Sequence, residues 1–367
     1  MKTNFPNTTN PTPRILTLFS QAKQNGGRPL NVSAPMVRYS KLPFRMLVRE
    51  YGADVIFTPM MLARESNRSQ IARDAEFTTH VWEMGGDDDD GTEGRGRRGV
   101  DVIDGDVGGN GDGNDKQAQN KPVVIIAQFA ASSPLEFARA AEMIAPWVDG
   151  IDLNCGCPQS WAIQSGIGCA LQDSPSLVAE MVRAAKTRVG KWGKSVSVKI
   201  RIHEDLEVTR RWLRIVQEAG VDFVTVHGRT RTQRSSTRPD YEAIRKLKEE
   251  GVVKVPLIAN GDAFSLADVR RIADLTGADG VMAARGILEN PAMFAGYEEV
   301  PVRCVQDFMY WAIKCPIPFP LVLHHVSEMT AKMEGMGKKE RRRLGECRDL
   351  VDLIDFVEDK WGLPRRR

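Results

Sequence analysis

The chain has 367 residues, of which 42% are hydrophobic and 27% are charged, and its formal net charge is +3. This composition is typical of a soluble globular protein with room for one large barrel and a smaller domain, and so small a net charge does not by itself indicate a nucleic-acid partner. No apolar run approaches the roughly 18 residues that span a bilayer, and the six cysteines lack the spacing of a disulfide scaffold. We therefore expect a protein of a reducing compartment, cytoplasmic or nuclear, without a membrane partner.

Residues 1–28 are rich in proline, asparagine and threonine, which predicts a flexible N-terminal tail. A short helix is expected within it, at residues 14–23. Three prolines at positions 6, 11 and 13 break any amphipathic targeting helix, and no apolar signal-peptide core follows Met1.

Residues 29–295 alternate between short β-rich runs and amphipathic helical patterns, which predicts a parallel sheet. Eight strands over this length predict an α/β fold of the TIM (β/α)8 barrel type. An open doubly wound sheet is the alternative, although no Gly-x-Gly-x-x-Gly motif follows the first strand. The expected strands are residues 30–36, 55–58, 122–128, 150–154, 195–201, 223–227, 255–259 and 280–283, and the clearest helices between them are 134–145, 176–189, 206–219, 241–250 and 265–275.

One insertion, at residues 83–120, interrupts this pattern. Between Gly85 and Asn114, 19 of 30 residues are glycine or aspartate. Such a segment cannot bury enough apolar surface to offset the entropy of ordering, so it predicts a disordered loop. We interpret the acidic run at 87–90 as part of a solvated linker, and no metal site is expected in the chain.

After Pro291 only helical patterns remain, so residues 296–367 predict a small C-terminal helical domain. The expected helices are 302–314, 320–333 and 339–361. Two basic clusters, at 338–343 and 365–367, are either solvated surface or contacts to nucleic acid.

Polar residues gather at the carboxyl ends of the expected strands, the end at which an α/β barrel carries its active site. Two consecutive strand ends contain a glycine that permits close backbone approach, Gly261 and Gly286, and the second also carries Arg285. Each leads into an expected helix start, which is how barrels build a phosphate site after their last two strands. The polar strand-end residues are Gln128, Asn154, Cys157, Lys199, Arg201, His227, Arg229, Asn260, Asp262 and Arg285.

Two of these side chains have two interpretations each. Lys199 alternates with apolar residues, so a cation facing the barrel interior needs a partner, either the electron-rich edge of a bound ring or an acid such as Asp152. His227 is either a core histidine with satisfied hydrogen bonds or a donor to the same ring or its phosphate.

Residues 150–158 form a short buried strand that ends in a sharp turn at Gly156 and Pro158. This turn lifts Cys157 out of the sheet at the end where chemistry is expected. The alternative is that Cys157 is a small buried hydrophobe. Of the two thiols in this segment, Cys157 is the candidate for chemistry and Cys155 is expected in the packing.

Taken together and in this order, the strand-end motifs closely resemble the tRNA-dihydrouridine synthases, flavin-dependent barrels that reduce a uridine of tRNA. The resemblance runs from about residue 31 to residue 295, the insertion excepted. The matching segments are Ala34-Pro35-Met36, Leu42-Pro43-Phe44-Arg45, Tyr51-Gly52-Ala53-Asp54, Ile151-Asp152-Leu153-Asn154, Gly156-Cys157-Pro158, Val198-Lys199-Ile200-Arg201, Thr225-Val226-His227-Gly228-Arg229-Thr230-Arg231, Asn260-Gly261-Asp262 and Ala284-Arg285-Gly286.

Four further segments, at 37–40, 58–61, 154–157 and 234–237, resemble one eukaryotic branch of this family, which modifies D-loop uridines 20a and 20b. In that branch the C-terminal part is a helical tRNA-binding region, and residues 316–325 with their paired histidines are similar to it. The resemblance therefore implies tRNA as the partner, and we expect a monomer.

The resemblance also implies FMN as the cofactor and NADPH (or NADH) as the reductant. Cys157 is then the general acid that protonates C5 of a flipped-out uridine after hydride transfer to C6. The implied cofactor residues are Pro35, Met36 and Val37 behind the ring, Gln128 and Lys199 at its polar edge, and His227, Asn260, Gly261, Asp262, Ala284 and Arg285 at the ribityl chain and phosphate. The implied substrate contacts are Asn154, Arg201, Arg229 and Arg231.

Two rival functions remain open from the sequence. One is a flavin oxidoreductase of a small molecule, of the dihydroorotate dehydrogenase type. The basic helical C-terminus and the cluster of Arg229, Arg231 and Arg234 argue against it, because a small substrate needs neither. The other is a catalytically silent tRNA-binding module, which would bind tRNA with a steep salt dependence but no flavin.

Overall fold

The computed structural model describes residues 10–80, residue 83 and residues 123–362. Apart from Glu83, the expected disordered loop therefore lies outside the described residues, as do the basic residues 365–367. In the described parts of the chain, no helix has the length and apolarity that crossing a membrane requires.

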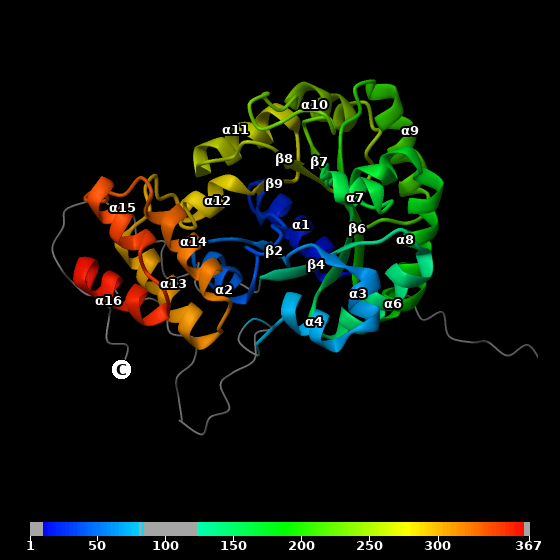
Figure 1. Cartoon of the computed structure of the whole chain (residues 1–367). Helices are drawn as coiled ribbons and strands as arrows, with labels where there is room; N and C mark the ends of the chain where they lie inside the picture. The colour runs from blue at the N-terminus through cyan, green and yellow to red at the C-terminus, as the bar shows by residue number, and fades with distance from the viewer. Residues whose placement is uncertain (1–9, 81–82, 84–122, 363–367) are drawn as a thin grey trace, which may run out of the picture.

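Eight parallel strands close into a barrel (Figure 1). The ring closes because β2 pairs with β1 on one side and with β4 on the other. A two-residue strand that the sequence did not predict, β3, extends the edge of β4. The TIM-barrel prediction is thus confirmed, with these strands: β1 Leu30–Ser33, β2 Val55–Phe57, β3 Met61–Leu62, β4 Val124–Ala130, β5 Gly150–Cys155, β6 Ser195–Arg201, β7 Phe223–His227, β8 Leu257–Asn260 and β9 Gly280–Ala283.

Helices surround the barrel, and several begin where a side chain accepts a backbone N–H of the first turn. Ser133 does so for α6, Asp240 for α10 and Ser265 for α11. The helices of the barrel are α2 Leu42–Glu50, α3 Ala63–Arg68, α4 Gln70–Glu76, α6 Pro134–Ile144, α7 Ser160–Gln164, α8 Pro175–Val189, α9 Leu206–Gln217, α10 Tyr241–Glu249, α11 Leu266–Thr276 and α12 Arg285–Glu289, and short 3-10 turns lie at Ala145–Trp147, Gly168–Asp173, Gly190–Trp192 and Met293–Ala295.

The N-terminal helix α1, Arg14–Gln24, lies at the amino end of the barrel. Its residues Ile15, Leu18 and Phe19 are buried in one cluster with inward-facing residues of the strands. Arg14 forms an ion pair with Asp149, which directly precedes β5. The sequence predicted this helix, but it also predicted that the tail around the helix is flexible, and for the residues of α1 that was wrong. The apolar face of α1 packs against the barrel and covers its amino end.

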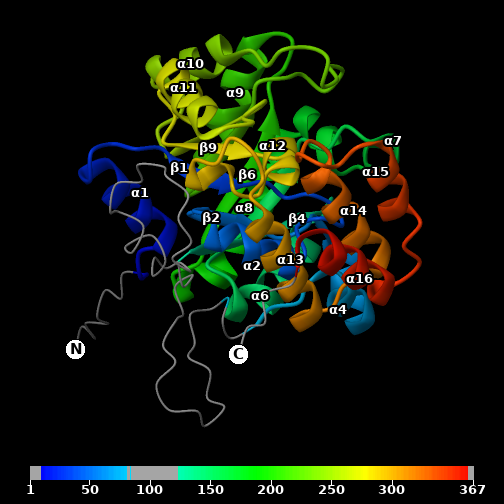
Figure 2. The same ribbon diagram turned by 90° about the vertical axis from the view of Figure 1, so that its left-hand side faces the viewer.

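The C-terminal helices α13 Val302–Lys314, α14 Phe319–Thr330, α15 Lys338–Gly345 and α16 Leu350–Trp361 form one group beside α2 (Figure 2). The group is attached to the barrel by polar contacts as well as apolar packing. Tyr51 donates a hydrogen bond to Asp307 at 3.0 Å, and the ring of buried His325 lies 3.1 Å from the carbonyl oxygen of Tyr39. A helical C-terminal region is therefore present, as expected.

The single helix expected at 339–361 is two helices, so that prediction was wrong. The break follows from Asp349, whose carboxylate accepts the N–H groups of Val351 and Asp352 and so starts α16 anew. Leu344 before the break and Leu353 after it are both buried, so apolar residues on both sides of the break contribute to the core.

Candidate active site

A cleft opens at the carboxyl ends of the barrel strands, formed by the ends of β6, β7 and β8 and by the residues that follow β1, β7, β8 and β9. Seven of the ten polar strand-end residues named above line it, whereas Gln128, Asn154 and Cys157 do not. Its lining consists of Ala34, Pro35, Lys199, Arg201, His227, Arg229, Asn260, Gly261, Asp262, Ala263, Phe264, Ala284, Arg285 and Gly286.

The segments that follow β7, β8 and β9 lie against one another so closely that only glycine fits at two positions. A Cβ atom on Gly286 would lie 2.1 Å from the carbonyl oxygen of Ala263 and 2.7 Å from the Cα atom of Phe264. Gly261 has φ of +145°, and a Cβ atom there would lie 2.8 Å from Pro239. These two glycines therefore expose backbone to the cleft, which suits an anionic group such as a phosphate.

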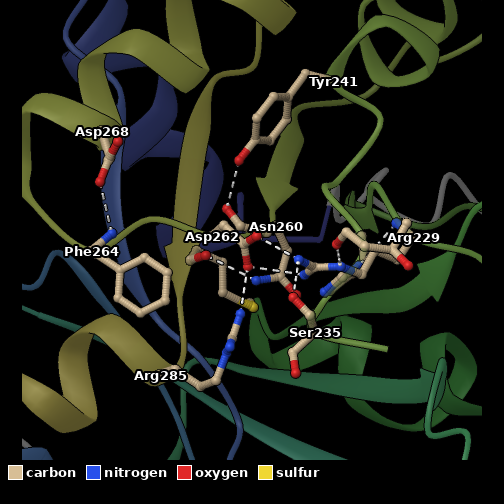
Figure 3. A network of polar contacts seen from close by, with 12 residues as sticks. Arg229, Ser235, Tyr241, Asn260, Asp262, Phe264, Asp268 and Arg285 are labelled. Atoms are coloured by element: carbon tan, nitrogen blue, oxygen red, sulfur yellow. Dashed lines mark hydrogen bonds and ion pairs between the residues drawn. The ribbon is translucent and has the colours of Figure 1, made fainter. Parts of the chain in front are cut away.

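The carboxylate of Asp262 lies between two arginines (Figure 3). Its Oδ1 atom accepts hydrogen bonds from Arg229 at 2.9 Å and from Arg285 at 2.6 Å, and Arg229 also bonds Oδ2. Asp262 has φ of +30°, a conformation that is costly for a residue other than glycine. The three charges leave one net positive charge on this side of the cleft, on the half-exposed side chain of Arg285.

Arg229 was expected to contact substrate, and the structure gives it other partners. The side chain is buried, and besides Asp262 it donates to the carbonyl oxygens of Ser235 and Thr237. It therefore holds the loop after β7 against the loop after β8. Arg231, the other arginine expected at the substrate, is exposed and forms an ion pair with Asp173.

His227 ends β7 and lines the cleft. Its Nδ1 atom accepts a hydrogen bond from the backbone N–H of Arg229, which assigns the ring proton to Nε2. Burial, together with the cations Lys199, Arg201 and Arg229, lowers the pKa of His227 well below its usual value. The ring is therefore neutral at pH 7 and has one N–H to donate.

Lys199 does not form the ion pair with Asp152 that the sequence left open. The oxygens of Asp152 accept instead from Ser197 at 2.6 Å and from Gln128 at 2.8 Å. Within the described residues the Lys199 ammonium has no hydrogen bond, and burial lowers its pKa to about 8. A half-buried ammonium with no partner, facing the cleft, indicates a site for an electron-rich or anionic ligand group.

A chain of hydrogen bonds fixes the turn that carries Cys157. Asn154 donates to Gln128 at 2.9 Å, and its Oδ1 atom accepts the N–H groups of Gly156 and Cys157. On the other side of the turn, Arg201 donates to the carbonyl oxygen of Gly156 at 3.0 Å. Asn154 and Arg201, expected at the substrate, thus both hold the Cys157 turn, and Gln128, expected at the cofactor, is fully buried beneath it.

The three thiols near this turn differ in their surroundings. Cys155 is the last residue of β5 and is fully buried in the main core, as expected, whereas Cys157 lies beyond the strand on the turn. Cys169 is also buried, and desolvation raises its pKa to about 11. Cys157 alone is partly exposed, beside the small cluster of Met60, Ala162 and Ile167.

The remaining expected cofactor residues lie in the loop after β1, at the end of β8 and directly after β9. Pro35 and Ala284 line the cleft, whereas Met36 packs partly into the core and Val37 is exposed. Asn260 lines the cleft and donates to the carbonyl oxygen of Met282.

Sequence reasoning missed the residues that brace the site. Ser40 accepts from the N–H of Met36 and donates to the carbonyl oxygen of Ala34, so it fixes the loop after β1. Ser197 of β6 donates to Asp152 on the adjacent strand β5 and so orients its carboxylate. In the sequence, Ser40 and Ser197 are only small polar residues near apolar ones. Many surface strands show the same pattern, so it could not single out these two residues.

These features fit a flavin mononucleotide better than a metal. The backbone beside Gly261 and Gly286, where no Cβ atom fits, can donate N–H groups to a phosphate. The Lys199 ammonium, which has no hydrogen bond among the described residues, and the Nε2–H of neutral His227 are further donors, to the phosphate or to the polar edge of a ring. Within the described residues no three His, Cys, Asp or Glu side chains come together as metal ligands. The fold and the cleft thus define a (β/α)8-barrel protein with cationic side chains in a cleft at the carboxyl ends of its strands and a partly exposed thiol, Cys157, on the turn after β5 at the same end.

Comparison with known proteins identifies which barrel family this is. The model of the dihydrouridine synthase (Dus) family matches residues 32–81 and 111–350. The chain therefore belongs to the dihydrouridine synthase family, and the fold and family expected from its sequence are confirmed.

Several curated relatives are similar over nearly their whole length. The tRNA-dihydrouridine(20a/20b) synthase of Schizosaccharomyces pombe is 41% identical over 340 residues, which cover 93% of this chain and 90% of that protein. The Saccharomyces cerevisiae protein of the same name is 38% identical, with coverage of 97% and 88%. The human tRNA-dihydrouridine(20a/20b) synthase-like protein is also 38% identical, with coverage of 92% and 93%.

Proposed function

We propose that this protein reduces uridines 20a and 20b in the D-loop of tRNA to dihydrouridine, with FMN as cofactor and NADPH as reductant. The relatives named for these two positions and for NAD(P)+ support the substrate and the reductant, because they match nearly the whole chain. The observation that carries the chemistry is the position of Cys157, a partly exposed thiol on a braced turn at the mouth of the barrel.

The phosphate of the FMN is held by the backbone beside Gly261 and Gly286, with Arg285 and the Nε2–H of His227 as donors. Lys199 donates to the polar edge of the ring, since its ammonium lacks any other hydrogen bond among the described residues. When bound, the flavin supplies the hydride that reduces the C5–C6 bond. Asp262 keeps Arg285 at the cleft while the buried Arg229 keeps Asp262 in place.

Cys157 is the general acid that gives a proton to C5 of the uracil. The acid must come within about 3–3.5 Å of the carbon, so the position of its backbone matters. Asn154 and Arg201 set that position by bonding the turn from both sides.

The C-terminal helices extend the surface that receives tRNA. Helix α15 carries five cations, and two of them have acidic partners: Arg342 pairs with Glu346, and Arg343 with Glu340 and Asp359. Lys338 and Lys339 are exposed at the start of α15, where they can reach phosphates. We propose that residues 296–362 bind tRNA, that the protein acts as a monomer, and that it is cytoplasmic.

A single-turnover assay tests the function. The holoprotein is reduced with NADPH and mixed with tRNA that lacks dihydrouridine, and the product is mapped by mass spectrometry. We expect dihydrouridine at 20a and 20b. Reduction of orotate or a free pyrimidine without any product in tRNA would replace this proposal with the small-molecule enzyme.

A further inference from the structure

An exposed tryptophan lies four residues beyond Cys157. Trp161 belongs to α7, the short helix that directly follows the Cys157 turn on the carboxyl side of the barrel (Figure 1). Four peptide units separate the Cα atoms of these two residues by at most about 15 Å. A large flat apolar side chain with 42% exposure therefore stands close to the proposed proton donor.

The helix that carries Trp161 is fixed to the barrel. Ala162, the next residue, is fully buried with Ile167 in the cluster that also contacts Cys157. The indole N–H donates to the side chain of Gln159, which restrains the ring. The exposed ring is therefore held in place before any ligand arrives, so little conformational entropy is lost when something stacks on it.

Two other tryptophans have nearly the same exposure but lie at the opposite end of the barrel. Trp147 is 44% exposed and precedes β5, and Trp192 is 43% exposed and precedes β6. Among the exposed tryptophans of the described residues, Trp161 alone follows a strand and so lies on the side of the cleft. Trp147 and Trp192 therefore serve as controls that match Trp161 in exposure but not in position.

From the position, the exposure and the restraint of the ring, we propose that Trp161 stacks on an unpaired nucleobase of the tRNA, next to the uridine that reacts at Cys157. This rests on the proposed function and adds a tRNA-binding residue to it. Extrusion of the target uridine unstacks its neighbours, and an aromatic platform replaces the lost stacking. Such a platform accepts any base, so it fits an enzyme that must accept two successive target positions.

The test compares Trp161→Ala with the matched control Trp147→Ala, both as FMN-loaded proteins. Loss of one stacked base weakens binding by about 5- to 150-fold. We expect KM for tRNA to rise by this factor in Trp161→Ala with kcat at saturating tRNA nearly unchanged, and we expect Trp161→Phe to restore most of the loss. The control should match the wild type, and flavin reduction by NADPH should be the same in all four proteins.

A direct readout is tRNA with 2-aminopurine at the nucleotides flanking the target. Its fluorescence should be quenched on binding to the wild type and to Trp147→Ala but much less on binding to Trp161→Ala.

Several outcomes would overturn the inference. One is an unchanged KM and unchanged quenching. Another is a lower kcat that phenylalanine does not restore, which would mean that Trp161 only shapes the Cys157 turn. A third is a higher KM for NADPH instead of tRNA. If the wild type itself formed no dihydrouridine, the proposed function would fail, whereas the fluorescence comparison would still report on the stacking.

Discussion

The substitution Gly286→Ala tests whether the close approach of the two loops builds the phosphate site. The added methyl group would lie 2.1 Å from the carbonyl oxygen of Ala263, so the loop after β8 must move by about 1 Å before the contact is tolerable. The obstacle is backbone, which cannot rotate away as a flexible side chain can. Overpacking of this kind costs about 1–3 kcal/mol, and we expect a value near the upper end.

This free-energy cost lowers either the stability of the protein or its affinity for FMN. If the loops stay in place, the free energy of unfolding falls by about 2–3 kcal/mol. If they separate, the protein keeps its stability and binds FMN about 100-fold more weakly, since each 1.4 kcal/mol is a factor of ten. Urea unfolding of the apoprotein and titration with FMN measure both. The control Gly345→Ala adds a methyl group in open space. Wild-type stability together with wild-type FMN affinity in Gly286→Ala would refute the reasoning.

Four further predictions concern single side chains. Cys157→Ala should slow uridine reduction in single turnover by about 10²–10⁴ while NADPH still reduces the flavin at the normal rate; equal rates of product formation would remove its role as acid. Because the pKa of Lys199 is lowered to about 8, FMN affinity of the apoprotein should fall as pH rises through 8, and Lys199→Arg should abolish that fall; a flat wild-type profile between pH 7 and 9 would contradict the assignment. Glu83→Ala should lower the free energy of unfolding by about 3–5 kcal/mol, because it leaves the buried guanidinium of Arg45 without its carboxylate; urea unfolding would show a much smaller loss if the pair is dispensable. Burial raises the pKa of Asp152 to about 6, above its unfolded value, so the folded state binds more protons between pH 4 and 6 and this residue adds stability as pH falls through that range; Asp152→Asn should remove the contribution from a pH series of unfolding curves.

The barrel and the place of its site could be predicted because both depend on local patterns. Buried strands such as β6 appear as apolar runs with polar residues at their carboxyl ends, and the repeated alternation with helices specifies the parallel arrangement. Cys157, Gly261 and Gly286 each follow a strand end, and parallel strands bring such residues to one face of the barrel.

Pairings between distant residues could not be predicted in the same way. Arg229 and Asp262 were both assigned to ligands, yet their charges meet each other, because two loops 33 residues apart in sequence lie side by side. Glu83 was placed at the start of a disordered insertion, although its carboxylate is buried against Arg45. The local sequence around a charged residue does not show which residue of opposite charge, distant in sequence, will lie next to it in the fold.

The most direct test of the account is the mapped dihydrouridine content of tRNA after reaction with the purified, FMN-loaded protein and NADPH. The tRNA should come from cells that lack dihydrouridine synthases, so that every dihydrouridine is a product of this reaction. The account predicts dihydrouridine at 20a and 20b with the wild type and almost none with Cys157→Ala. Product from the wild type at other D-loop positions only would contradict the positional assignment, and no dihydrouridine at any position would contradict the function itself.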